Sequence, residues 1–385
     1  MSILNVLAIF GTRPEAIKMA PLVKELERHP DQIRCSVAVT AQHREMLDQV
    51  LELFRITPAY DLNIMLPNQT LYEITTRALT GLGEILDEAA PDIVLVHGDT
   101  TTTFVAGLAA FYRQIKVGHV EAGLRTGNKY SPFPEEMNRR LTGAIADIHF
   151  APTVTAKSNL LKEGVNPESI LVTGNTVIDA LLATVKDSYA FNNPVLDAID
   201  YTKSRVLVVT THRRENLGEP MRNVYGALRA VVEKHSDVEV VFPVHKNPKI
   251  RQIVESVLGG LPRVHLIDPL EYAPMVNLMN KAYLVLTDSG GLQEEAPSLG
   301  KPVLVLRDTT ERPEAIDAGT VQMVGTNRDA IFNACQTLLE DRTQYDKMAN
   351  AVNPYGDGKA CARIAAGLKY FCNLGGSKPR EFITQ

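Results

Sequence analysis

Short apolar runs, rich in β-branched residues, recur along the first half of the chain, and longer stretches with helical spacing of apolar residues separate them. Runs of this length predict buried strands, and the helical stretches predict crossover connections. The alternation therefore indicates βαβ units and a parallel sheet. The predicted strands of this first series are residues 6–10, 36–40, 93–97, 117–121, 148–151 and 170–173.

A second series of the same kind begins near residue 206. Before it, residues 185–203 contain turn formers and no strong strand pattern, so we place a domain linker there. The two halves predict an α/β fold of two Rossmann-like, doubly wound parallel-sheet domains that face each other across a cleft. We expect an N-terminal domain at 1–185 and a C-terminal domain at 204–358. The predicted strands of the second series are 206–210, 238–244, 264–267, 284–287, 303–306 and 321–324.

The bulk composition narrows the choice of partners. The 385 residues suffice for two domains of ordinary size. Lys and Arg total 40 against 45 Asp and Glu, which argues against a nucleic-acid partner or a membrane-seeking basic face. The four cysteines have no CxxC or metal-ligand spacing, which indicates reduced thiols, and the first apolar run is too short for a signal peptide or membrane span. We therefore expect a cytoplasmic protein with no membrane partner.

Carboxylates follow strands of the first series. Asp99 comes directly after a predicted strand in "HGDTTTT", Glu121 follows the next apolar run, and Glu135 and Glu136 follow two prolines in "YSPFPEEMNRRLTG". Asp99 alone would be explained equally well as a helix N-cap. Three carboxylates at neighbouring strand ends would repel one another and raise at least one pKa, which suits general acid/base chemistry near neutral pH. We therefore favour chemistry over capping.

The second series carries a different set of polar residues. In "TDSGGLQEEAPSLGKP", Ser289, Gly290 and Gly291 form a small-residue turn at a helix start, where main-chain amides could approach a diphosphate. Glu295 lies about one helical turn further on and could accept hydrogen bonds from ribose hydroxyls. Arg312 follows the next strand in "RDTTERPEA". Together these features indicate a nucleoside diphosphate site.

Further basic residues follow strands in both halves. The first loop, "FGTRPEAIKMAP", has a single glycine followed by Arg13 and Lys18, in place of the usual glycine-rich loop. In the second half, "THRRENLG" places His212 and Arg213 after one strand, and "FPVHKNP" places His245 after the next. No G-x-G-x-x-G follows a strand and no P-loop motif or paired Cys/His set occurs. We therefore expect neither a dinucleotide cofactor nor a metal.

Taken together, the motifs resemble those of the bacterial non-hydrolysing UDP-N-acetylglucosamine 2-epimerases. The resemblance implies the GT-B arrangement of two Rossmann-like domains, a C-terminal helix at about 360–372 that returns to the first domain, and a homodimer. The matching motifs run from residue 11 to about 358: "GTRPEAIKMAPL", "TAQHREMLDQV", "VHGDTTTT", "VEAGLRT", "SPFPEEMNRRLTG", "HRREN", "DSGGLQEEAPSLGKPVLVLRDTTERPEA" and "NPYGDG".

The reaction implied by this resemblance is reversible inversion at carbon 2, which interconverts UDP-N-acetylglucosamine and UDP-N-acetylmannosamine. UDP would leave carbon 1 as the proton leaves carbon 2, giving 2-acetamidoglucal, and would then add back without NAD. The product would supply cell-envelope polysaccharide. The matching motif positions imply catalytic roles for Asp99, Glu121, Glu135 and His212, and substrate contacts for Arg13, Lys18, Asp99, Glu121, His212, Arg213, Leu270, Ser289, Gly290, Gly291, Glu295 and Arg312.

Some relatives also carry a second UDP-N-acetylglucosamine site that activates the enzyme. Its pocket matches Gln42, Glu135, Arg213 and His245 here, whereas Glu45 and Asn68 replace a glutamine and an arginine of some relatives. Three alternatives stay open at this point: a GT-B glycosyltransferase, a hydrolysing epimerase that releases free N-acetylmannosamine, and a nucleotide-sugar-binding regulator without turnover. The set of three carboxylates argues against the first and the last.

Overall fold

The computed structural model describes residues 3–41, 44–66, 68–213, 216–310 and 312–383. The chain divides into two compact units, which are described separately. Unit 1 comprises Met1–Ala183 and Tyr355–Gln385, and unit 2 comprises Thr184–Pro354. The chain thus crosses between units twice, at the end of helix α7 (Thr176–Thr184) and again just before Tyr355.

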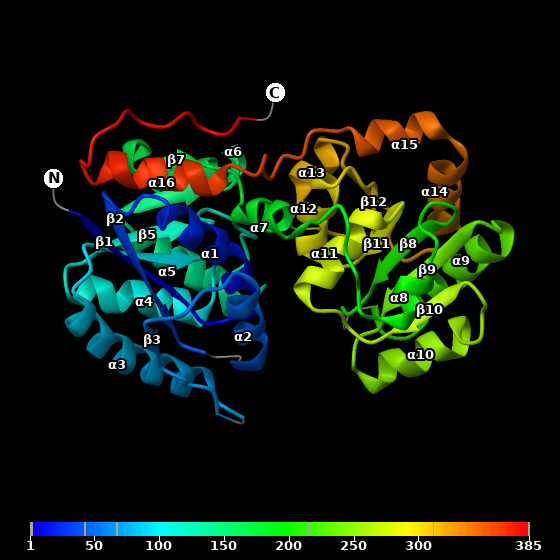
Figure 1. The fold of residues 1–385 in the computed structure, drawn as a ribbon, viewed down its shortest axis with the longest axis horizontal. Coiled ribbons are helices and arrows are strands. Elements are labelled where there is room, and N and C mark those ends of the chain that lie inside the picture. Colours follow the sequence, from blue (N-terminus) through cyan, green and yellow to red (C-terminus); the bar gives the residue numbers. More distant parts are fainter. Residues whose placement is uncertain (1–2, 42–43, 67, 214–215, 311, 384–385) are drawn as a thin grey trace. The chain divides into compact units, whose positions relative to one another are not determined.

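Unit 1 is built on a seven-stranded sheet with the order β3-β2-β1-β4-β5-β6-β7 (Figure 1). Its strand pairs are all parallel among the described residues. The order reverses between β1 and β4, which is the switch point where doubly wound sheets bind ligands. The strands are β1 (Leu4–Phe10), β2 (Ile33–Val39), β3 (Tyr60–Asp61), β4 (Ile93–His97), β5 (Lys116–Val120), β6 (Ile148–Ala151) and β7 (Ile170–Val172).

Helices bury both faces of this sheet. Along β1, Val6, Ala8 and Phe10 enter one core cluster, and Leu7 and Ile9 enter another, as expected for a strand covered on both sides. The C-terminal helix α16 belongs to unit 1 and contributes to the first cluster. The helices of unit 1 are α1 (Arg13–Leu26), α2 (Arg44–Leu53), α3 (Leu71–Ala89), α4 (Thr101–Tyr112), α5 (Glu135–Ile145), α6 (Val154–Lys162), α7 and α16 (Ala360–Phe371), with a short 3₁₀ turn at Pro167–Ser169.

Unit 2 repeats the plan with a six-stranded sheet of order β10-β9-β8-β11-β12-β13, which reverses between β8 and β11. Its strands are β8 (Arg205–Thr210), β9 (Val238–Pro243), β10 (Val264–Ile267), β11 (Leu284–Thr287), β12 (Val303–Val305) and β13 (Val321–Met323). Its helices are α8 (Pro194–Ala198), α9 (Glu219–Lys234), α10 (Pro248–Leu258), α11 (Tyr272–Lys281), α12 (Gly290–Ser298), α13 (Pro313–Asp317), α14 (Arg328–Glu340) and α15 (Arg342–Ala349).

The predicted class, two doubly wound parallel sheets, is confirmed by this topology. Each predicted strand has a counterpart within a few residues of its predicted ends. The prediction missed β3, because a strand of two residues has no apolar run to reveal it. It also missed α8, a helix of five residues that lies within the stretch assigned to the linker.

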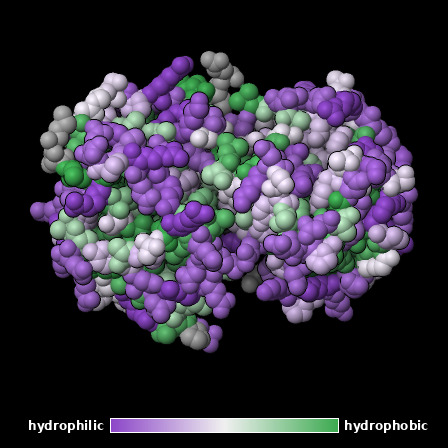
Figure 2. All heavy atoms as spheres, viewed as in Figure 1, coloured by the Kyte–Doolittle hydropathy of each residue, from purple (hydrophilic) through white to green (hydrophobic). Residues whose placement is uncertain are grey.

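Hydrophilic residues cover most of the face drawn in Figure 2, and hydrophobic residues form small separate patches on it. Among the residues that the structure describes, the most exposed large apolar residue is Tyr72 on α3, at 85%. Scattered exposed apolar side chains of this kind are normal on a protein surface. Within the part of the chain that the structure describes, no helix combines the length and the hydropathy needed to cross a membrane.

Candidate active site

The loop after β1 is shaped by one glycine and one buried carboxylate. A Cβ on Gly11 would lie 2.0 Å from Thr40 Oγ1 and 2.5 Å from Thr102 Oγ1, so the backbone passes where only glycine fits. The Glu15 carboxylate accepts hydrogen bonds from the amides of Gly11 and Thr12, at 3.1 and 2.8 Å. Glu15 thus closes a capping box on the first turn of α1.

The same carboxylate also reaches the first turn of α4. Its second oxygen accepts hydrogen bonds from the hydroxyls of Thr100 and Thr103, at 2.7 and 3.1 Å. Burial raises the pKa of Glu15, and these hydrogen bonds oppose the shift. Glu15 therefore holds two strand-end loops together, and Arg13 becomes the first residue of α1.

Glu121 lies directly after β5, at the carboxyl edge of the sheet. Its backbone has φ of 61°, the left-handed region that few side chains adopt and that often marks a functional site. The buried carboxylate pairs with Lys18 and accepts a hydrogen bond of 2.8 Å from Asn175 Nδ2. His97 Nε2 lies 3.8 Å from the other oxygen. The structure thus brings the predicted residues Lys18 and Glu121 into direct contact.

Three buried histidines lie on the neighbouring strands β4, β5 and β6 of this sheet: His97, His119 and His149. His119 is paired in register with His149, and its Nε2 lies 2.7 Å from the carbonyl oxygen of Gly98. Burial lowers the pKa of His97 to about 4, of His119 to about 3 and of His149 to about 4. All three rings are therefore neutral at pH 7, and His97 approaches Glu121 as an uncharged group.

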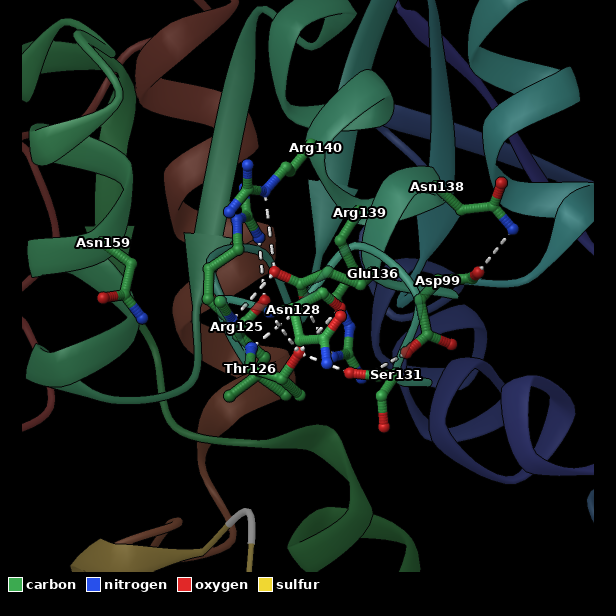
Figure 3. Close-up of polar contacts among 12 residues, drawn as sticks. Asp99, Arg125, Thr126, Asn128, Ser131, Glu136, Asn138, Arg139, Arg140 and Asn159 are labelled. Atoms are coloured by element: carbon green, nitrogen blue, oxygen red, sulfur yellow. Dashed lines mark hydrogen bonds and ion pairs between the residues drawn. The ribbon is translucent and has the colours of Figure 1, made fainter. Parts of the chain in front are cut away.

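Asp99 is held by two residues of α5 (Figure 3). The Arg139 guanidinium forms an ion pair with the Asp99 carboxylate. Asn138 Nδ2 donates a hydrogen bond of 2.9 Å to the Asp99 backbone carbonyl. Asp99 is therefore not the N-cap of α4: that position is Thr100, whose side chain accepts the amide of Thr103.

The two carboxylates at the start of α5 differ in their surroundings. Glu136 is fully buried and accepts hydrogen bonds from the amides of Thr126 and Gly127, at 3.0 and 3.2 Å, so it braces the preceding loop (Figure 3). Glu135 is half-buried, and within the described ranges the structure gives it no hydrogen bond or ion pair. Of this pair, Glu135 is thus the carboxylate open to a ligand.

In unit 2, a cavity of about 230 Å³ opens at the carboxyl ends of β8, β9 and β10. Four of the predicted site residues line it. They are His212, His245, Leu270 and Ser289, together with Thr210, Thr211, Pro243, Pro269, Met275 and Leu292.

Asp288 was missed by the sequence reasoning, although it stands inside the quoted "TDSGG". It is fully buried at the end of β11 and accepts hydrogen bonds from the amides of His212 and Arg213, at 2.8 and 2.9 Å. The ring Nδ1 of His212 lies 2.8 Å from Asp288 Oδ1. Burial works against ionisation of Asp288, but the His212 and amide donors outweigh it and lower the pKa. Asp288 therefore orients the His212 ring, an arrangement visible only once strands β8 and β11 are known to be adjacent.

Helix α12 begins with two residues that have no side chain, Gly290 and Gly291. A Cβ on Gly290 would have the Arg312 guanidinium as its nearest neighbour, at 3.9 Å, and one on Gly291 would lie 3.8 Å from Glu295 Oε2. Ser289 donates its amide to Thr287 Oγ1 at 2.9 Å. The predicted turn, Arg312 and Glu295 thus meet at one helix N-terminus.

Arg312 and Glu295 are each held by a further residue of unit 2. The Arg312 guanidinium pairs with buried Glu294, which the sequence reasoning gave no role. The Tyr272 hydroxyl donates to Glu295 Oε1 at 3.1 Å. A basic group with a buried counter-ion next to free helix amides is suited to bind an anion.

The residues of the predicted activator pocket are only partly described. Gln42 lies outside the described residues. His245 is exposed, and its Nδ1 accepts the amide of Asn247 at 3.1 Å. Glu45 lies in the first turn of α2, and Asn68 has a left-handed backbone with φ of 59°.

Two doubly wound units, one with charged side chains at its sheet edge and one with an anion-binding helix start, define the chain as a two-domain Rossmann-like α/β protein. The family model described as UDP-N-acetylglucosamine 2-epimerase matches residues 24–369. The chain belongs to this family, whose members are isomerases.

Individual relatives agree over the full length. The UDP-N-acetylglucosamine 2-epimerase of Bacillus subtilis (strain 168) is 58% identical over 382 residues, which cover 99% of both chains. The Neisseria meningitidis UDP-GlcNAc 2-epimerase, solved bound to UDP-GlcNAc, is 52% identical with a TM-score of 0.85 and covers 95% of this chain and 100% of its own. The Methanocaldococcus jannaschii enzyme, solved with UDP-GlcNAc and UDP, is 35% identical with a TM-score of 0.76 over 95% and 100%.

Proposed function

We propose that this protein interconverts UDP-N-acetylglucosamine and UDP-N-acetylmannosamine by eliminating UDP and adding it back. The observation that carries the proposal is the pairing of Glu121 with Lys18 at the sheet edge of unit 1, in a family whose members are solved with UDP-GlcNAc. A carboxylate held in a fixed orientation is suited to proton transfer.

The chemistry explains why both kinds of site are needed. The hydrogen on carbon 2 is not next to a carbonyl, so its direct removal is too slow. When the carbon 1–oxygen bond breaks, UDP leaves with the electron pair, the proton of carbon 2 passes to a carboxylate, and a double bond forms between carbons 1 and 2. The return step delivers a proton to the opposite face of carbon 2 as UDP adds to carbon 1.

Within this scheme the roles divide by unit. Asp99, Glu121 and Glu135 are the acid/base candidates, and Arg13 and Lys18 supply positive charge near the sugar diphosphate. In unit 2, His212 and Arg213 contact substrate. The UDP contacts are Leu270, Ser289, Gly290, Gly291, Glu295 and Arg312.

The sharpest test is incubation with UDP-N-acetylglucosamine alone in deuterated water, followed by proton NMR. We expect both epimers to accumulate with deuterium at carbon 2, because the proton is lost to a carboxylate that exchanges with solvent. Protium retained at carbon 2 at full equilibrium would exclude elimination. Release of free N-acetylmannosamine would identify a hydrolysing enzyme, and a need for an acceptor would identify a glycosyltransferase.

The proposal extends to regulation and assembly on the strength of the family resemblance. A second UDP-N-acetylglucosamine molecule, contacted by Gln42, Glu135, Arg213 and His245, acts as activator of the reverse reaction. The protein works as a homodimer and supplies cell-envelope polysaccharide. We place it in the cytoplasm, and its four cysteines, which are free thiols, agree with that location.

A further inference from the structure

Asn175, a buried residue in the loop between β7 and α7, forms hydrogen bonds to three different parts of unit 1. Its Nδ2 donates to Glu121 Oε1 at 2.8 Å. Its Oδ1 accepts the amide of Val177, at 3.1 Å, in the first turn of α7. Its own amide donates to the carbonyl of Tyr355 at 2.6 Å. None of these contacts was expected from the sequence.

These contacts also fix the orientation of the Asn175 side-chain amide group. The backbone N–H of Val177 needs an acceptor, so it faces the side-chain oxygen of Asn175. The side-chain nitrogen of Asn175 therefore faces the Glu121 carboxylate. Only asparagine offers an acceptor to the helix and a donor to the carboxylate at this length. Aspartate would place an oxygen against Glu121, and serine would reach the helix amide but not the carboxylate.

The two segments that Asn175 contacts are the two connections between the units. Helix α7 carries the chain out of unit 1, and Tyr355 is the first residue of the returning segment. The connections are also bonded to each other, because Asp179 of α7 accepts the amides of Ala360 and Cys361 at 3.2 and 2.9 Å.

Close backbone packing accompanies these bonds. A Cβ on Gly174 would lie 3.3 Å from Gly356 Cα, and one on Gly356 would lie 3.2 Å from Ile178 Cγ1. Both glycines have positive φ, of 85° and 157°. The backbones of the outgoing and returning connections therefore meet directly beside Asn175, which leaves its side chain little freedom to turn away from Glu121.

We propose that Asn175 is a positioning residue for Glu121, and that it ties the orientation of this carboxylate to the junction of the two connections between the units. The inference rests on the proposed acid/base role of Glu121. In this role Asn175 acts on the reaction through its contact with Glu121. Asn175 and Lys18 both contact Glu121 Oε1, and together the two donors hold the position of that oxygen.

The test compares Asn175→Ser and Asn175→Asp, which both keep an oxygen for the Val177 amide and both remove the donor to Glu121. Asn327→Ser is the matched control, because Asn327 caps α14 through the amides of Asp329 and Ala330 at 3.0 Å each, in unit 2. Steady-state kinetics on UDP-N-acetylglucosamine, calorimetry with UDP and thermal melting are measured for each folded variant.

We expect Asn175→Ser to lower kcat about 10-fold with KM and UDP affinity changed less than about 2-fold, as for a group that acts on the transition state alone. Asn175→Asp should lower kcat further and move the acidic limb of the pH–rate profile to higher pH, because a second carboxylate beside Glu121 disfavours its ionised form. Asn327→Ser should cost thermal stability and leave kcat unchanged.

The Glu121→Gln background separates this inference from the proposed function. If Asn175 acts through Glu121, adding Asn175→Ser to Glu121→Gln causes no further loss of deuterium exchange at carbon 2. Two outcomes would overturn the positioning role while leaving the Glu121 role intact. One is that Asn175→Ser causes the same loss in Glu121→Gln as it does when Glu121 is present, and the other is a kcat within about 2-fold of wild type for both Asn175 variants. Near-normal turnover of Glu121→Gln by itself would instead overturn the proposed role of Glu121.

Discussion

The two units share one topology but hold their functional groups in different ways. In unit 1, carboxylates that follow strands are paired with basic side chains of helices, as Glu121 is with Lys18 of α1 and Asp99 with Arg139 of α5. In unit 2, the start of α12 lies next to a cavity that Ser289 and Leu292 help to line. The contrast is between carboxylates held in fixed orientations, as we propose for proton transfer, and a helix start with a nearby cation, as we propose for diphosphate binding.

The first and largest expected difference between the units is their response to acid. Burial holds the pKa of His97 at about 4, of His119 at about 3 and of His149 at about 4, against about 6.5 in the unfolded chain. Below pH 6.5 the unfolded chain therefore binds protons that folded unit 1 excludes. The free energy of unfolding of unit 1 should fall between about pH 6.5 and 4, by up to about 4 kcal/mol per pH unit for three protons.

Hydrogen exchange followed by mass spectrometry at pH 7 and pH 5 measures this, after correction for the intrinsic exchange rate. Peptides from β4, β5 and β6 should lose protection ahead of peptides from β8, β9 and β11. Replacing one of the three rings, as in His149→Gln, should reduce the acid dependence by about a third. Equal loss of protection in both units would show that the three buried histidines do not set the acid response.

The second difference concerns turnover. Glu121→Gln and Asp99→Asn should each lower kcat by at least about 100-fold, because each removes a proposed proton-transfer group. UDP affinity, which we assign to unit 2, should stay within about 2-fold by calorimetry. Glu163→Gln is the control, since Glu163 forms an ordinary ion pair with Arg125 at 2.7 Å in the same unit. Near-normal kcat in both amide variants would reject the acid/base assignment.

The sequence predicted the class of fold and most strands because parallel strands buried on both faces leave continuous apolar runs. It also predicted that Lys18 and Glu121 serve one site, through the family resemblance. It could not predict that Asn175 contacts Glu121, that Asp288 contacts His212 or that Arg139 pairs with Asp99. Those partners depend on which strand ends become neighbours and on side-chain orientation, and neither leaves a local pattern. Glu136 illustrates the same limit, since it adjoins Glu135 in sequence but turns inward to brace a loop.

The smallest of the three effects should appear in unit 2, where Arg312→Lys removes the planar guanidinium but keeps the charge. Lysine lacks the rigid fork with which arginine pairs with Glu294 while directing another N–H group toward the start of α12, so UDP affinity should fall about 10-fold. The kcat at saturating substrate should change less than KM, because uniform binding is lost rather than transition-state contact.

A matched variant sharpens this last comparison. Arg251→Lys alters an arginine that also pairs with a carboxylate, Asp268, in unit 2, but that lies apart from α12 and lines a different cavity. It should leave the dissociation constant of UDP unchanged. If Arg312→Lys lowered kcat and left KM and UDP affinity intact, the division of labour between a chemical unit and a binding unit would be wrong, because Arg312 would then belong to the transition state. If both arginine variants weakened UDP binding equally, the effect would come from the loss of any guanidinium group in unit 2. It would then not be specific to the start of α12.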